Sequence, residues 1–254
     1  MKNLLILFAL LFCNQYTLSA QQYYLPISSK SAAATATYYK ALSLGENAHI
    51  PEYLTEMNKA VQEDPTFFFA MAHLTLSYIA FKDDKAQEMM RRALAIPGSG
   101  FTPAESTLRK LLVQLNQDSN MDPTEIMNEL IAAYPNTWQA YELAANTAKF
   151  ILGNEAASAA HMQTMARLRP LHGTAYNGLG YHYMAINEMK KAKAAFKKYI
   201  RVAPKESNAY DSMGEYYMTV KDYKKSARYY DKATQLGMKS SKERADQARS
   251  MINS

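Results

Sequence analysis

Cysteine is almost missing from this chain: Cys13 is the only one among 254 residues, and it lies within the first twenty. The remaining sequence therefore offers no disulfide and no thiolate ligand for a metal. Long apolar runs are also scarce, because outside residues 4–12 nothing approaches the roughly 20 apolar residues that a transmembrane helix needs. Stretches that alternate apolar and polar residues are missing as well, which argues against strands and favours an all-α fold.

Catalytic and cofactor-binding patterns are equally poor. The five histidines include no pair at i, i+4 with a glutamate between them, the usual spacing of a zinc site. Residues 177–180 only partly resemble a phosphate-binding loop, since no strand precedes them and Gly180 has a packing explanation. Neither a Gly-x-Ser-x-Gly elbow nor a phosphate loop with its lysine occurs. We therefore expect a protein that is not an enzyme and that binds neither a cofactor nor a metal.

The first twenty residues predict a secretory signal peptide. Met1-Lys2 is followed by an unbroken apolar run, Leu4 to Phe12, and then by small residues that end at Ala20. We therefore expect an exported protein, periplasmic or secreted, with its mature N-terminus near Gln21. An alternative is lipidation of Cys13, which would anchor the protein to a membrane; the bulky Phe12 stands where lipoprotein signals have a small residue.

Prolines divide the rest of the chain at nearly equal intervals. Pro65, Pro97, Pro135, Pro170 and Pro204 each end a stretch with apolar residues at helical spacing. The stretch between Pro170 and Pro204 is repeated position by position in the stretch that follows Pro204. The first contains Tyr176, Leu179, Gly180, Tyr183, Ala192 and Phe196; the second contains, at the same relative places, Tyr210, Met213, Gly214, Tyr217, Ser226 and Tyr230.

This pattern resembles the tetratricopeptide repeat family, and Pro204 and Ala233 also match it. Tyr199 departs, because alanine is usual at its place. The resemblance implies a right-handed superhelical solenoid of about six antiparallel helix pairs and a C-terminal capping helix. In the third pair, Leu112 replaces a small residue, so we expect looser packing there. We expect a signal peptide at 1–20, an N-terminal arm at 21–30, two divergent pairs at 31–100, a divergent pair at 101–138, three repeats at 139–240 and the capping helix at 241–254.

Two joints between these parts carry local signals. The sequence Pro97-Gly98-Ser99-Gly100 predicts a flexible joint between the second and third pairs. Ser240 and Glu243 have the spacing of a capping box, which predicts the start of the capping helix. On that helix we expect Ala245, Ala248 and Ile252 to pack inward.

The resemblance also implies a binding surface. In this family, partners usually enter the concave side, which is lined by the first helix of each pair. The positions of this chain that match are polar or flexible, and acids among them favour a cationic ligand. The candidate groove residues are Arg109, Asn116, Glu142, Asn146, Asn177, Tyr181, Met184, Asn208, Asp211 and Glu215.

Charge is uneven along the chain, with 13 basic and 15 acidic residues up to Arg169, but 16 and 8 from Pro170 onward. The lysines repeat with the unit on the second, outer helices, for example Lys190 and Lys224, so we interpret them as a solvated face and expect no nucleic acid partner. An anionic membrane or polysaccharide is an alternative ligand for this face.

We expect a non-enzymatic adaptor, scaffold or assembly factor that binds a peptide or protein segment outside the cytoplasm. Self-association through an apolar end of the groove, at Phe69, Leu76 and Ile79, is one alternative. A glycan-binding or small-molecule-binding protein or an enzyme that uses the same groove is another.

Overall fold

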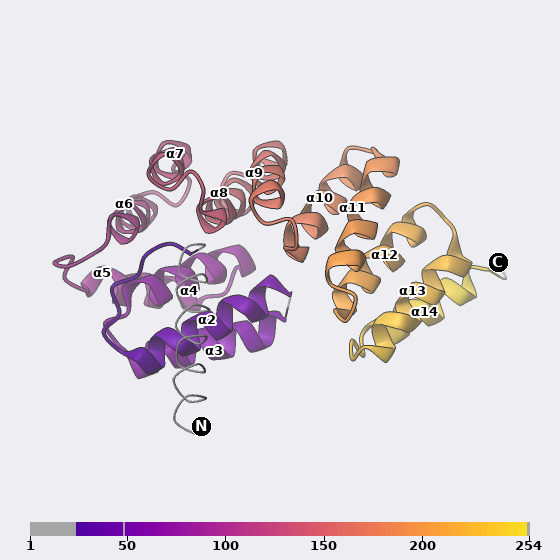
Figure 1. Cartoon of the computed structure of the whole chain (residues 1–254), viewed down its shortest axis with the longest axis horizontal. Helices are drawn as coiled ribbons and strands as arrows, with labels where there is room; N and C mark the ends of the chain where they lie inside the picture. Colours follow the sequence, from indigo (N-terminus) through magenta and orange to yellow (C-terminus); the bar gives the residue numbers. More distant parts are fainter. Residues whose placement is uncertain (1–23, 48, 253–254) are drawn as a thin grey trace, which may run out of the picture. The chain divides into compact units, whose positions relative to one another are not determined.

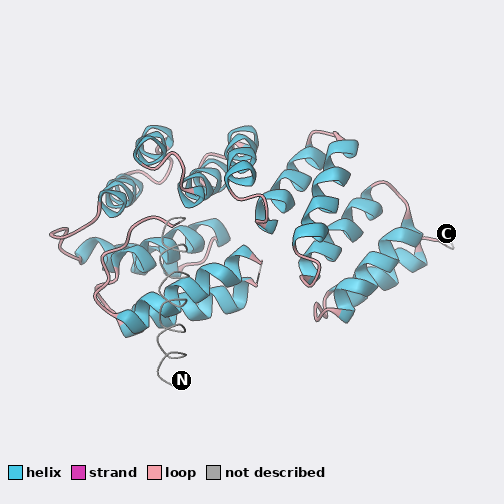
Figure 2. Cartoon of the chain, in the orientation of Figure 1, coloured by secondary structure: helices cyan, strands magenta, loops and turns pink. Residues whose placement is uncertain are grey.

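The computed structural model describes residues 24–47 and 49–252, drawn in Figures 1 and 2. This part of the chain contains thirteen helices and no strand, so the predicted all-α fold is confirmed. The predicted signal peptide and Cys13 lie outside the described residues.

Twelve helices follow one another as six pairs, and a single helix ends the chain, as the sequence predicts. The pairs are α2 (Ala32–Glu46) and α3 (Ile50–Glu63), α4 (Phe68–Phe81) and α5 (Lys85–Ala95), α6 (Pro103–Gln117) and α7 (Thr124–Ala133), α8 (Trp138–Phe150) and α9 (Glu155–Leu168), α10 (Gly173–Ala185) and α11 (Met189–Val202), and α12 (Ser207–Thr219) and α13 (Tyr223–Gln235), followed by α14 (Ser241–Ser250).

One tyrosine in the first turn of α8, α10 and α12 fixes the repeat register. Its hydroxyl donates a hydrogen bond of 3.0 Å to the carbonyl of the proline six residues earlier, in the pairs Tyr141 with Pro135, Tyr176 with Pro170 and Tyr210 with Pro204. The proline that ends one pair is thereby tied to the helix that begins the next. The same bond in all three places confirms the alignment of the less regular stretch from Trp138 to Pro170.

In each of the two regular pairs, a glycine of the first helix lies under an aromatic ring of the second. A methyl group on Gly180 would lie 2.3 Å from Cε1 of Phe196, and one on Gly214 would lie 2.6 Å from Cδ1 of Tyr230. Both rings are buried. Each glycine therefore lets the second helix of its pair approach the first closely.

Two departures from the family pattern have local explanations. Tyr199 is fully buried, and its ring lies over Gly173, where an added Cβ would be 2.5 Å from Cε2 of the tyrosine. The missing side chain at Gly173 thus makes room for the large one. Ser226 replaces the usual alanine and is also fully buried, and its hydroxyl donates to the Gly214 carbonyl at 2.9 Å.

The turn inside a helix pair repeatedly uses a left-handed residue. Lys82, Gly153, Asn187 and Lys221 have φ angles of 55°, 64°, 61° and 60°, and the last three are equally spaced along the chain. Lys221 is therefore the true counterpart of Asn187. Asp222, the next residue, accepts a hydrogen bond from the Lys225 amide at the start of α13.

The chain divides into two compact units. Unit 1 consists of residues up to Thr35 and residues 60–154, of which 24–35 and 60–154 are described; unit 2 consists of residues 36–59 and 155–254, described up to Ile252 except for residue 48. Unit 1 thus holds an extended segment before α2 together with α4 to α8. Unit 2 holds most of α2 and α3 together with α9 to α14.

Within unit 1, the expected loose packing of the third pair is confirmed, because α6 and α7 approach each other much less closely than α10 and α11 do in unit 2. The expected joint at 97–100 is spanned by a side chain. The guanidinium of Arg109 on α6 donates to the carbonyls of Leu94 and Ile96, at 3.0 and 2.8 Å. This brace connects the end of α5 to α6 across the glycine-rich loop.

The predicted capping box of α14 is wrong. Ser240 already has helical angles, with φ −61° and ψ −25°, and its side chain caps no amide, because an N-cap needs a more extended backbone. Ala245 and Ala248 are buried as predicted, but Ile252 is 39% exposed. The helix is instead attached through Ser241, whose hydroxyl donates to the Asp211 carboxylate on α12.

Candidate functional site

The first helices of the two regular pairs bring candidate groove residues together in unit 2. The Tyr181 hydroxyl on α10 donates to Oε2 of Glu215 on α12 at 2.9 Å and lies 3.3 Å from Oγ of Ser212. Burial raises the pKa of Tyr181 well above its ordinary value, and the Glu215 carboxylate raises it further. The tyrosine therefore remains a neutral donor to a carboxylate at any ordinary pH.

Asp211, on the same face of α12, is committed to the fold. Its carboxylate accepts a hydrogen bond of 2.6 Å from the Ser241 hydroxyl and pairs with the Arg244 guanidinium at 2.5 Å. Only 4% of the residue is exposed. The sequence placed Asp211 among residues that a ligand would meet, but in the structure the first turn of α14 occupies this carboxylate. Glu215 is thus the acidic side chain of this face that a cationic ligand could reach.

The turn between α2 and α3 covers the start of α10. Thr174 donates its hydroxyl to the Glu46 carbonyl, and the Glu46 carboxylate pairs with Arg169 at 2.8 Å. His172 is 3.9 Å from the same carboxylate, but Arg169 neutralises that charge. Burial, helped by Arg169, lowers the pKa of His172 to about 3. A second contact of this turn joins His49 to Glu206 at 2.9 Å.

The other candidates of unit 2 differ in how free they are. Asn208 donates to the Tyr199 hydroxyl at 3.2 Å, and Met184 is half-buried against the core formed with Phe196 and Tyr217. Asn177 is half-buried, and its Oδ1 has no hydrogen-bond partner among the described residues. A buried acceptor without a donor is uncommon in proteins. Because that oxygen is itself buried, any contact of Asn177 with a ligand would use the exposed part of its side chain.

Unit 1 contains a site that the sequence did not predict. Residues 24–31, which we call the arm, run extended before α2, and Figure 1 draws them in indigo. The Leu25 amide donates to Oε1 of Gln139 at 2.8 Å, and the Leu25 side chain is buried. The Tyr24 ring packs edge-on against Trp138, with 5.4 Å between centroids. The first turn of α8 thus binds both the backbone and the side chains of the arm.

The first turn of α6 binds the next part of the arm through a buried carboxylate. Oε1 of Glu105 accepts from the Ser28 amide at 3.0 Å and from the Ser28 hydroxyl at 2.8 Å. Its other oxygen accepts from the Thr102 amide in a capping box. The Thr102 hydroxyl in turn donates to the Pro26 carbonyl at 3.0 Å. Thr102 and Glu105 therefore cap α6 and hold the arm at the same time.

The remaining candidates of unit 1 do not gather at this site. Arg109 braces α5, as described above, while Asn116 and Asn146 are exposed and Glu142 is half-buried. Phe69, expected at an apolar end of the groove, is fully buried in the core, whereas Leu76 and Ile79 are half-buried. The sequence missed the arm because Leu25 and Gln139 are 114 residues apart, and no local pattern links them.

The lysines of the second helices lie where the sequence placed them. Lys190 and Lys224 are exposed on α11 and α13. Their neighbours form pairs within one helical turn, Lys191 with Glu188 at 3.4 Å and Lys225 with Asp222 at 2.5 Å. These exposed pairs contribute little to stability.

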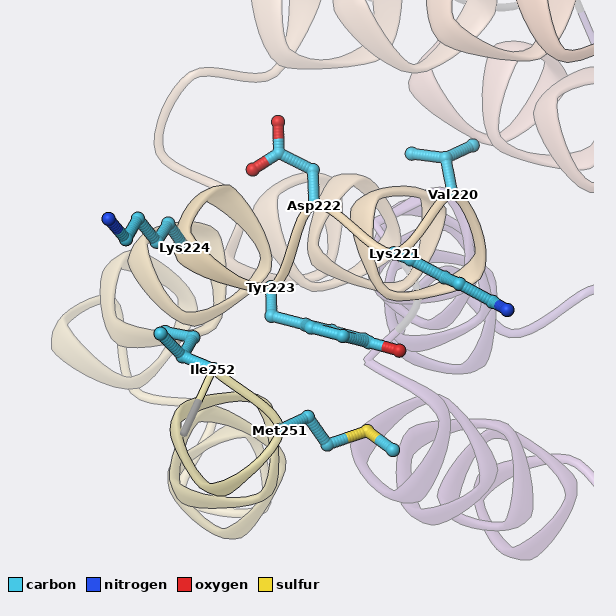
Figure 3. A pocket seen from close by; sticks show the side chains of 7 residues that line it. All are labelled: Val220, Lys221, Asp222, Tyr223, Lys224, Met251 and Ile252. Carbon is cyan, nitrogen blue, oxygen red and sulfur yellow. The ribbon is translucent and has the colours of Figure 1, made fainter. Parts of the chain in front are cut away.

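A shallow cavity lies at the C-terminal end of unit 2, between the α12–α13 turn and the last described residues (Figure 3). The Tyr223 and Met251 side chains face it, and Lys221 lies at its edge. None of the ten candidate groove residues lines this cavity.

The described residues contain neither a candidate metal site nor a candidate membrane-spanning helix. No group of three or more histidine, aspartate or glutamate side chains within 24–47 and 49–252 could hold a metal ion. No helix in the described part is both long and apolar enough to cross a membrane.

One segment of this chain matches a known family of repeats. Residues 173–206, which span α10 and α11, match the sequence model of the tetratricopeptide repeat. This segment is a tetratricopeptide repeat. The repeat model begins at Gly173, the glycine under Tyr199, and ends at Glu206. Among curated proteins, none matches this sequence.

Several solved structures resemble the chain. A thermophilic tetratricopeptide repeat protein of Thermus thermophilus, TTC0263, has a TM-score of 0.51 and 14% identity over 85% of this chain and 98% of that one. PilW, a type IV pilus biogenesis factor, has a TM-score of 0.44 and 19% identity over 79% and 92%. MamA has a TM-score of 0.42 and 18% identity over 82% and 94%. The first of these shows that the fold is shared.

Proposed function

We propose that this tetratricopeptide repeat protein is a non-enzymatic interaction module that binds an extended segment of a partner protein along α10 and α12. Proteins with this repeat generally serve as interaction scaffolds. The arm is the observation that carries the proposal, because Gln139 at the second residue of α8 already binds the backbone of an extended segment. The equivalent residues of α10 and α12, Thr174 and Asn208, already bond to Glu46 and Tyr199, so the proposed surface lies farther along these two helices.

Three side chains define the proposed surface. Asn177 is half-buried on α10, where its side-chain amide would meet the backbone of a bound segment. Glu215 is a carboxylate held in place by Tyr181, and a lysine or arginine of the partner would pair with it. Met184 adds a flexible apolar side chain to this face. A partner segment with a basic residue close to an exposed backbone amide fits this arrangement.

We also propose that the protein acts outside the cytoplasm. The support is the N-terminal sequence itself, in which Lys2 precedes the apolar run from Leu4 to Phe12. N-terminal sequencing of the protein recovered from its host tests this, and we expect a chain that begins near Gln21. A chain that retains Met1 would contradict it, whereas a lipid on Cys13 would keep the protein outside the cytoplasm and anchor it to a membrane.

The binding surface is tested by capture of partners from the host's extracytoplasmic fraction with matched variants. We expect Asn177→Ala and Glu215→Gln each to weaken capture of a given partner by about tenfold, because each removes a bond to the bound segment. Lys190→Glu and Lys224→Glu, on the second helices, should leave capture within about twofold. Loss of capture in the lysine variants alone would place the binding surface on the opposite helices.

A further inference from the structure

The arm is bound as a protein groove binds a peptide. It forms no helix or strand, and hydrogen bonds connect it to side chains of unit 1: from Leu25 to Gln139, from Thr102 to Pro26, two from Ser28 to Glu105, and one of 2.8 Å from Ser29 to Asp64. Side chains that satisfy an extended backbone in this way recognise a peptide by its main chain and select it by the side chains between.

The groove is also a built site, because its polar groups are withdrawn from water. With the arm in place, Glu105 and Gln139 are both 0% exposed, and the arm supplies hydrogen bonds to each of them. A buried carboxylate or amide that loses such a partner is costly to the fold. The groove formed by Asp64, Thr102, Glu105, Trp138 and Gln139, which we call the arm site, therefore favours having an extended segment in place.

The arm can leave without unfolding a helix. It joins the described fold at Ser31, whose hydroxyl accepts from the Ala34 amide at the start of α2 and whose own amide donates to the Ser29 hydroxyl at 3.2 Å. Lys30, the residue before it, is exposed. Rotation about the backbone between Lys30 and Ser31 would free residues 24–29 at the cost of the bond between Ser29 and Ser31, while the Ser31 hydroxyl still accepts from the Ala34 amide.

We propose that the arm site is a second peptide-binding site, which takes a segment of a partner protein when the arm leaves. The segment has the chemistry of Leu25-Pro26-Ile27-Ser28: a large apolar residue, then proline, and a serine or threonine three places after the apolar one. This site lies wholly in unit 1 and does not depend on the proposed surface of α10 and α12.

Each position of this pattern has a physical reason. Leu25 is buried, so a polar residue there would cost free energy. Proline suits the second place because it has no amide proton and therefore needs no acceptor there. Its carbonyl accepts from the Thr102 hydroxyl. Ser28 gives the Glu105 carboxylate two donors, and an acidic residue there would be repelled.

The arm limits access to the site. Because it belongs to the same chain, it competes at an effective concentration in the millimolar range. A partner segment must therefore bind more tightly than the arm, or arrive at several copies on one assembly, before it displaces the arm. The full chain is then a gated form of the binding protein.

Trp138 provides the readout, because it is the only tryptophan and its ring contacts Tyr24 of the arm. The experiment uses the full chain with the arm weakened by Leu25→Asp and Ser28→Asp together. We expect a red-shifted Trp138 emission and unchanged helical circular dichroism. A labelled peptide with the sequence of residues 22–31 should then bind this variant with a Kd of micromolar order, and the unsubstituted chain at least about tenfold more weakly.

Matched peptides decide whether the proposed chemistry is right. Serine to aspartate at the place of Ser28, or leucine to aspartate at the place of Leu25, should abolish binding to the weakened-arm variant. The proposal is wrong if the native peptide fails to bind while the Trp138 emission shows that the arm has left. It is also wrong if the helical signal is lost, or if the emission stays unchanged, because the arm is then a fixed part of the core.

Sedimentation of the unsubstituted chain tests a different occupant. A dimer that disappears in the variant with Leu25→Asp and Ser28→Asp would show that a second copy donates its arm, and would overturn the assignment to a partner protein. A monomer at all concentrations is the expected result. Because the readout is Trp138 in unit 1, failure here leaves the capture experiment on Asn177 and Glu215 in unit 2 unaffected.

Discussion

The two units build helix pairs from the same fold but complete them differently. In unit 2, the pair α12 and α13 repeats the pair α10 and α11, and each is closed by a glycine under an aromatic ring, Gly180 with Phe196 and Gly214 with Tyr230. In unit 1, Leu112 stands in the place of the small residue, and α6 and α7 pack loosely. There the arm contacts the first turns of α6 and α8. Regular pairs thus complete their own packing, whereas divergent pairs use an additional segment of chain.

This difference also separates the two binding surfaces. The peptide-binding side chains of unit 1, Glu105 and Gln139, already hold the arm. In unit 2, the turn at Glu46 and the start of α14 cover Thr174 and Asp211, while Asn177 and Glu215 stay partly exposed. A regular repeat therefore leaves part of its face open, and a divergent one has its face occupied.

The largest expected effect comes from removing bulk in unit 1. Leu112 is fully buried, so Leu112→Ala should lower the free energy of unfolding by about 2 to 5 kcal/mol through lost burial and a residual cavity. Urea unfolding followed by Trp138 emission measures this, since the tryptophan belongs to unit 1. A loss below about 1 kcal/mol would mean that the third pair does not use this residue as core.

Adding bulk should be the damaging change in unit 2. Gly180→Leu should cost about 1 to 3 kcal/mol, because even a Cβ there would meet the Phe196 ring. The melting temperature from circular dichroism measures it, and Ala185→Leu, on an exposed position of the same helix, is the matched control. Equal melting temperatures for Gly180→Leu and the unsubstituted chain would contradict the glycine–aromatic pairing.

Acid should destabilise both units through one buried histidine each. Burial lowers the pKa of His73 to about 4 in unit 1, and the pKa of His172 is about 3 in unit 2. Since the unfolded chain takes up these protons near pH 6.5 and the folded chain does not, stability is fully present above that pH and falls as pH decreases toward 4 and 3. Between pH 7.5 and 5.5 each histidine should cost about 1.4 kcal/mol.

Urea midpoints at the two pH values measure this loss. His73→Leu should remove the pH dependence of the transition followed by Trp138 emission and leave that of the remaining helical signal. An unchanged dependence in His73→Leu would show that another group in unit 1 is responsible.

The smallest effect should be the same in both units, because it is local to a turn. Lys82 and Lys221 have positive φ angles, which asparagine tolerates better than lysine does. Lys82→Asn and Lys221→Asn should each raise the free energy of unfolding by about 0.5 kcal/mol, and Asn187→Lys should lower it by a similar amount. Thermal melts of the three variants measure these shifts; destabilisation by both lysine replacements would show that the turns do not constrain these residues.

The fold follows from the sequence wherever the decisive contacts lie within one repeat. Tyr176 and Pro170, or Gly180 and Phe196, are close in the chain, so the periodic pattern predicts both the helices and their packing. The candidate site was less predictable because its contacts are distant. Asp211 has the position of a groove residue, but α14 binds it from 30 residues away. The arm meets Gln139 across 114 residues, which no periodic pattern can indicate.

The central claim is that the face of α10 and α12 binds a partner protein. A photo-crosslinking residue placed at Asn177, compared with one at Lys190 on α11, tests it most directly in the intact host. We predict crosslinks to the same partner protein from Asn177 and none from Lys190. Crosslinks to that partner from Lys190 and none from Asn177 would contradict the account.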